Sequence, residues 1–286
     1  MDIYARLTSK LHRLMAELPA YSARFDFGRL FTDAGRVLAR AWLPIVIGVL
    51  VLGVAPVVLS AMPWWRAPPA TTAETFRRVS TRVNLAKTLV TVVAHSAAMV
   101  YVAAASLTVL AGASWRETFQ LRRLAAGFAT SLCINLLGNW ASFAGIVVAS
   151  FAQDYRLLLI LGLAGRLSAL AVAAYLGIAP AAALAEQLFV GPAMARSFRL
   201  LRGLRWRMVG LGLTYLLVLG LAEYGLVLAL SVASIPYQPP GLGRAVIEVA
   251  PVLVAAVTSA IFVSFFLQAR RITDGPTASE LHEVFA

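Results

Sequence analysis

The sequence predicts an all-α membrane protein with six transmembrane helices. Of its 286 residues, 60% are hydrophobic and only 13% are charged, whereas soluble domains carry about 25% charged residues. Six long apolar stretches divide the chain, and roughly 20 apolar residues are enough for a helix to cross a bilayer. Basic residues are concentrated in alternate segments between these stretches, as expected for loops on the cytoplasmic side of a membrane.

The chain divides into three parts. We expect residues 1–40 to form a cytoplasmic amphipathic segment, residues 41–268 a six-helix transmembrane domain, and residues 269–286 a cytoplasmic tail with a short helix. Within the domain, the spans are predicted at residues 42–61, 85–110, 124–151, 157–185, 208–233 and 246–268.

Charge predicts the orientation of these spans. The two terminal segments and the loops between them on the same side carry seventeen Lys and Arg residues, against seven in the opposite loops. The positive-inside rule therefore places both termini in the cytoplasm, in a multi-pass protein of the cell membrane. The first opposite loop weakens this bias, because its basic residues at 77–87 fit the cytoplasmic side equally well.

A short amphipathic stretch precedes each odd-numbered span, at residues 27–40, 115–123 and 192–207. Such a helix lies in the membrane interface with its apolar face toward the lipid. The recurrence suggests a three-fold pseudo-repeat of helix pairs. The alternative is that any multi-span protein places basic segments at its cytoplasmic side.

The third stretch, residues 192–207, is the strongest candidate for lipid binding. Met194, Phe198 and Leu201 share one helical face, and the arginines lie elsewhere. The candidate contacts for anionic headgroups are Arg196, Arg199 and Arg202.

The two ends of the chain carry further helix signals. Residues 2–18 have apolar residues at helical spacing, which favours a helix on the cytoplasmic leaflet or, alternatively, one packed on the protein's own surface. Gly275 and Pro276 predict the end of the last long helix. Thr277 with Glu280 has the spacing of a capping box for a new short helix.

A few polar residues lie within the predicted spans, where ionisable groups are costly and are candidate functional sites. The candidate intramembrane polar site comprises His95, Asn135, Asn139, Arg166 and Glu223. We expect Arg166 to face the bundle interior and to pair with Glu223. A structural ion pair is one interpretation, and a substrate or proton site is the other. Asn135 and Asn139 share one helical face and would bridge helices or line a hydrated cavity.

Catalytic, metal-binding and cofactor motifs are not visible, so we expect neither enzyme activity nor a cofactor. His95 is the one histidine inside a predicted span, and the three histidines lack metal-ligand spacing. Intramembrane proteolysis needs a nucleophile with a base, paired aspartates or a metal motif. The basic segments lack the interleaved aromatics of a nucleic-acid interface, so no nucleic-acid partner is expected.

One recognisable pattern within residues 186–207 comprises Glu186, Gly191, Ala193, Arg196, Ser197, Leu200 and Gly203. This pattern resembles the bacterial membrane-domain family of glycerophosphoryl diester phosphodiesterases. Residues 25–40 and the ending from Arg270 to Phe285 are also similar to that family. The resemblance implies a stand-alone six-span domain without the catalytic barrel, so the phosphodiesterase activity is not carried over.

Two functional hypotheses follow. In the first, the protein is a non-enzymatic membrane module that binds lipid or scaffolds a membrane-protein partner. In the second, it is a transporter or translocator of a small solute or lipid that uses the polar site around Arg166. A dry, closed bundle favours the first, and a polar cavity that reaches one face favours the second.

Overall fold

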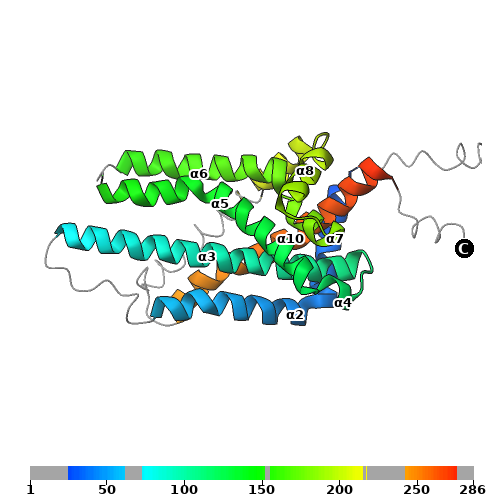
Figure 1. The fold of residues 1–286 in the computed structure, drawn as a ribbon, viewed down its shortest axis with the longest axis horizontal. Helices are drawn as coiled ribbons and strands as arrows, with labels where there is room; N and C mark the ends of the chain where they lie inside the picture. Colours follow the sequence, from blue (N-terminus) through cyan, green and yellow to red (C-terminus); the bar gives the residue numbers. More distant parts are fainter. Residues whose placement is uncertain (1–24, 62–72, 152–154, 215–216, 218–241, 276–286) are drawn as a thin grey trace, which may run out of the picture.

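The protein was analysed as a computed structural model that describes residues 25–61, 73–151, 155–214, 217 and 242–275. The regular secondary structure of these residues is entirely helical. The helices are α2 (Phe27–Ala61), α3 (Ala73–Leu110), α4 (Trp115–Thr118), α5 (Leu121–Phe151), α6 (Tyr155–Leu176), α7 (Ala179–Glu186), α8 (Val190–Leu200) and α10 (Leu242–Asp274). Residues 205–214 are also helical. The long helices run along the long axis of the molecule, and α4, α7 and α8 gather at one end (Figure 1).

Three of the described ranges are long and apolar enough to cross a membrane: Phe27–Leu52, Thr88–Leu110 and Leu163–Glu186. The predicted third and sixth spans fall within α5 and α10, and most of the predicted fifth span lies outside the described residues. The all-helical class is therefore confirmed, whereas the count of six spans and their orientation stay predictions.

Helix α2 joins the first amphipathic stretch to the first predicted span. The backbone leaves helical geometry at Ala41, with φ −118° and ψ 20°, directly before the predicted start of that span. One face buries Leu30, Ala34, Val37, Ala41 and Ile45 against α3 and α10, a spacing that follows the helical repeat. The outer face exposes large apolar side chains, among them Trp42, Ile47 and Val51. That pattern is typical of a helix solvated by lipid on one side.

The predicted fourth span at residues 157–185 overlaps the apolar range Leu163–Glu186, but it is not one continuous helix. Helix α6 ends at Leu176, and the separate helix α7 begins at Ala179. Pro180 lies in the first turn of α7, where its missing N–H is harmless, whereas within one long helix its ring would clash with the carbonyl of Leu176. Gly177 donates its backbone N–H to the Ala173 carbonyl at 2.9 Å, which closes the last turn of α6.

Hydrogen bonds join α10 to α2 and to the residues directly before it, which are distant from α10 in the sequence. Gln268 accepts a hydrogen bond from the Asp26 backbone N–H at 3.1 Å and donates its amide to the Asp26 carbonyl at 3.2 Å. Four residues earlier, Ser264 donates its hydroxyl to the Asp33 carboxylate of α2 at 2.8 Å. Helix α10 passes the predicted end of the sixth span and stops at Asp274, followed by Gly275 with φ +83°. The predicted helix end at Gly275 is confirmed.

The three predicted amphipathic stretches take different forms. Residues 27–40 continue into the span through the kink at Ala41, α4 is a single turn capped by Ser114, and α8 is a separate helix followed by a turn at residues 201–204. The pseudo-repeat therefore stays a prediction. The predicted helices at residues 2–18 and after Thr277 lie outside the described residues.

The substitution Gly177→Ala should destabilise the junction of α6 and α7. A Cβ at position 177 would lie 2.6 Å from the Ala173 carbonyl oxygen and 2.6 Å from Met208 Cε, so the backbone would have to shift, at a cost of about 1–3 kcal/mol. Thermal unfolding of the purified full-length chain in detergent should show a lower Tm.

Gly35→Ala is the matched control for this substitution. Its Cβ would meet no atom within 4 Å, and alanine is the better helix former at an exposed helical position. Its Tm should equal or exceed that of the parent. Equal Tm values for Gly177→Ala and the parent would contradict the assigned role of Gly177.

Candidate functional site

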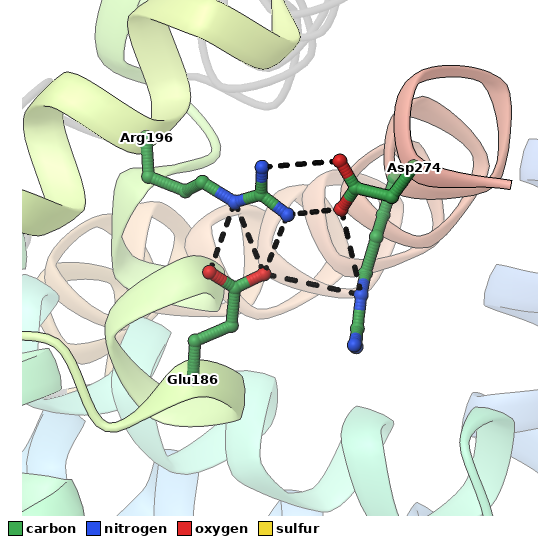
Figure 2. A network of polar contacts seen from close by, with 4 residues as sticks. Glu186, Arg196 and Asp274 are labelled. Carbon is green, nitrogen blue, oxygen red and sulfur yellow. Dashed lines mark hydrogen bonds and ion pairs between the residues drawn. The ribbon is translucent and has the colours of Figure 1, made fainter. Parts of the chain in front are cut away.

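Four charged side chains meet where α7, α8 and α10 come together, and we call them the Arg196 network: Glu186, Arg196, Arg270 and Asp274 (Figure 2). The Arg196 guanidinium donates to Glu186 from Nε at 2.9 Å and from Nη2 at 3.0 Å. It also donates to Asp274 from Nη1 at 3.2 Å and from Nη2. Arg270 lies 3.9 Å from the Glu186 carboxylate and 4.0 Å from that of Asp274.

The network balances two positive and two negative charges at the edge of the bundle. The Arg196 side chain is 15% exposed and that of Glu186 is 20% exposed, so water screens this pair only in part. Hydrogen bonds to Asp274 and then to Glu186 raise the pKa of Arg196 above its usual value. The hydrogen bond from Arg196 holds the pKa of the Asp274 carboxyl below its usual range. Two-pronged arginine–carboxylate contacts of this kind fix geometry as well as charge.

The network corrects the prediction that Arg196 is a headgroup contact, because its donors are directed at two carboxylates of the protein. The predicted apolar face of α8 is corrected as well. Leu201 is fully buried, and the inner face of α8 consists of Ala193, Ser197 and Leu200. Ser197 donates its hydroxyl to the Tyr175 carbonyl at 3.1 Å. Helix α8 therefore packs on the end of α6 and not in lipid alone.

Exposed arginines and exposed aromatic rings occur together on α8, on the turn at residues 201–204 and at the start of the helix at residues 205–214. Arg199, Arg202 and Arg207 are exposed, and Phe198 and Trp206 are 47% and 86% exposed. We call these five residues the elbow face. Beneath it, the Arg205 guanidinium carbon lies 4.6 Å from the ring centre of Tyr175 and 4.5 Å from that of Phe198. These cation–π contacts hold Phe198 in place.

The two asparagines of the predicted intramembrane site lie together on α5. The Asn135 amide nitrogen donates to Ser96 Oγ of α3 at 2.9 Å and to Ser131 Oγ at 3.4 Å. The Asn139 amide nitrogen donates to the Asn135 backbone carbonyl at 2.8 Å. The expected bridging of helices is thus present between α5 and α3, since Asn135 spans the two.

The other three residues of the predicted site do not join this pair in the described structure. His95 is half-buried on α3, next to Ser96. Arg166 is exposed among the described residues and is not on the face of α6 that packs on α5. The reason is helical geometry: α6 faces α5 through Ser168, whose hydroxyl donates to the Gly138 carbonyl at 3.1 Å, and Arg166 is about 200° away around the helix. Glu223 lies outside the described residues, so its predicted pairing with Arg166 stays a prediction.

A cavity of about 110 Å³ lies beside the asparagines. Its lining comes from α3, α5, α6, the α6–α7 junction and α10, and includes Met99, Ser131, Asn135, Asn139, Gly177 and Pro180. Within the described ranges, no group of three or more His, Cys, Asp or Glu side chains is placed to hold a metal ion. No family model, curated protein or solved structure matches this chain.

Sequence reasoning missed Glu186, Arg270 and Asp274 as partners of Arg196, because they are distant in the chain. Asp274 is 78 residues from Arg196. One signal could have indicated them: all four residues of the Arg196 network lie in the two segments, 186–207 and the ending from Arg270, on which the family resemblance rests.

The substitution Asp274→Asn should lower the Tm of the full-length chain by a few degrees at pH 7, because it removes the second carboxylate from Arg196. The difference from the parent should shrink as the pH falls below the usual carboxyl value of 3.8. The sign follows from the depressed pKa of Asp274: its stabilising charge is fully present above the unfolded-state pKa and is lost as the pH falls through the lower folded-state pKa.

Thermal unfolding at several pH values between 7 and 3 tests this expectation. Glu117→Gln removes an exposed carboxylate from α4 and should leave the Tm at pH 7 unchanged. A Tm difference for Asp274→Asn that stays constant across this range would show that the ion pair is not its cause.

Proposed function

We propose that this protein is a non-enzymatic, multi-pass module of the cytoplasmic membrane that binds anionic lipid headgroups through the elbow face. Both termini lie in the cytoplasm in this proposal, on the side of the membrane where the elbow face meets the lipid. The observation that carries the proposal is the mixed composition of that face: Arg199 and Arg202 lie between the exposed rings of Phe198 and Trp206 in the chain, and Arg207 follows Trp206.

Each residue type of the elbow face suits a membrane interface. Tryptophan is enriched at headgroup level because its ring is apolar and its N–H is polar. Arginine forms forked hydrogen bonds to phosphate and stays charged at any physiological pH. A basic residue close to an anionic leaflet contributes about 1 kcal/mol, so Arg199 and Arg202 together would strengthen binding by about 30-fold.

The buried side of the elbow supports the same proposal. The Arg196 network and the bond between Ser197 and Tyr175 attach α8 to α7, α6 and α10. An elbow held in this way presents its arginines in a fixed arrangement, which lowers the entropy lost when a headgroup binds. The same rigid face could serve a membrane-protein partner, and this scaffolding function is the second form of the proposal.

The alternative function, a transporter built around Arg166, has less support. Its central residue is exposed on α6 on the side that carries the exposed Leu163 and Leu167, and it is not among the residues that line the cavity. The resemblance to the phosphodiesterase membrane domain agrees with a membrane module, and we retain membership of that family as part of the proposal.

Replacing Arg199 and Arg202 by glutamine should lower the affinity of the purified full-length chain for phosphatidylglycerol by about 30-fold. Binding of a fluorescent phosphatidylglycerol to the protein in nanodiscs measures this. The parent should lose affinity as salt is raised, because the contacts are partly exposed to solvent.

The matched control replaces Arg40 and Arg122, two exposed arginines on the same predicted side of the membrane. It removes the same charge from α2 and α5 and should change lipid binding by less than two-fold. A loss as large as that of the Arg199/Arg202 variant would mean that net charge, and not the elbow face, attracts the lipid.

The orientation makes a separate prediction. In a Cys133→Ser background, a cysteine at position 70 should react with a membrane-impermeant maleimide from outside intact cells. A cysteine at the exposed position 203 should react only after the membrane is opened. Labelling of both positions from the same side would contradict the topology.

A further inference from the structure

The cavity beside Asn135 and Asn139 is lined by polar as well as apolar residues. Both asparagines are half-buried and lie one helical turn apart on α5. Their amide nitrogens are used within the protein, by Ser96, Ser131 and the Asn135 carbonyl. These bonds fix the orientation of each amide group.

The side-chain oxygens of the two asparagines, in contrast, do not form hydrogen bonds with the described residues. Neither Asn135 Oδ1 nor Asn139 Oδ1 accepts a hydrogen bond from any described residue. A polar atom without a hydrogen-bond partner is costly in an apolar environment. Two such acceptors on residues that line a cavity therefore favour a molecule in the cavity that donates hydrogen bonds to them.

The junction of α6 and α7 forms another part of the cavity lining. Gly177 and Pro180 both line it. Non-helical backbone within a membrane domain is tolerated where it is buried in protein or lines a hydrated cavity, and Gly177 and Ile178 between the two helices are buried.

The size and charge of the cavity limit the class of ligand. Its volume of about 110 Å³ exceeds the ~15 Å³ that one water needs and lies below the ~300 Å³ of drug-sized pockets. The described lining residues include no charged side chain, so an ion would lie there without a counter-charge. An apolar cavity of similar size can stay dry, and the asparagines are what distinguishes this one.

We propose that the cavity between α3, α5, the α6–α7 junction and α10 is a binding site for a small uncharged molecule that donates hydrogen bonds to Asn135 and Asn139. Water and small polyols share this chemistry. The site is separate from the elbow face and does not depend on lipid binding, since the two share no residue.

Solid-state NMR of the full-length chain in lipid bilayers tests the proposal. Magnetisation transfer from water to the side-chain amides of Asn135 and Asn139 is measured in one sample, and transfer from carbon-13 glycerol to the same groups in a second. Transfer from water alone would identify water as the ligand, and transfer from glycerol would identify a polyol site. Transfer from neither would mean that the cavity is empty, and the proposal would be overturned.

Two variants test whether the magnetisation transfer comes from a molecule in the cavity. Ala173→Leu places an apolar side chain at a position that lines the cavity and should remove most of the transfer. Ala171→Leu adds the same side chain at an exposed position of α6 and should leave the transfer as in the parent. Undiminished transfer in Ala173→Leu would place the ligand elsewhere and overturn the assignment, and the result for the parent stands even if this variant fails to fold.

Discussion

The position of Arg196 between two carboxylates is the interaction on which the organisation of one end of the molecule depends. A guanidinium that is largely shielded from water is stable only when opposite charge compensates for lost hydration. Glu186 is the last residue of α7 and Asp274 is the last residue of α10, whereas Arg196 belongs to α8. The pairing of these charges therefore brings the three helices together. The fork geometry of arginine allows both carboxylates to bind at once, which lysine could not reproduce.

Helix α10 extends this order through the rest of the bundle. It packs against α2 and α3, where Phe265, Phe266, Ala260 and Ala269 are fully buried. Its polar residues bond to backbone or to short side chains of neighbouring helices, as Ser259 does with the Met99 carbonyl at 2.6 Å. In lipid, where apolar burial contributes little between helices, close packing and such hydrogen bonds supply the association.

The sequence predicted the features that depend on local chemistry. Apolar length and composition predict an all-helical class, and the glycine at 275 predicts the end of α10 because only glycine adopts positive φ without strain. The change from basic to apolar residues predicts a boundary between residues 40 and 41, and the backbone of α2 leaves helical geometry at Ala41. Each signal acts within a few residues of its effect, so no knowledge of the packed structure was needed.

The features that escaped prediction depend on contacts between distant residues or on a single residue within a uniform stretch. Hydropathy averaged over residues 157–185 does not register Pro180, which divides the segment into two helices. Periodicity places Arg166 on a helix but does not identify which side the neighbouring helix covers. Arg196 was assigned to lipid because its partners are on other helices, and one of them is 78 residues away.

The bonds between Asp26 and Gln268 join residues that are 242 positions apart. A ribosome adds about 5–20 residues per second, so roughly 10–50 s separate the synthesis of the two partners. During that interval α2 is made without the helix that covers part of its buried face, and Asp33 lacks its hydroxyl donor. The bundle is therefore completed only after translation has passed α10. A nascent chain that ends before α10 still exposes the part of the α2 face that α10 covers.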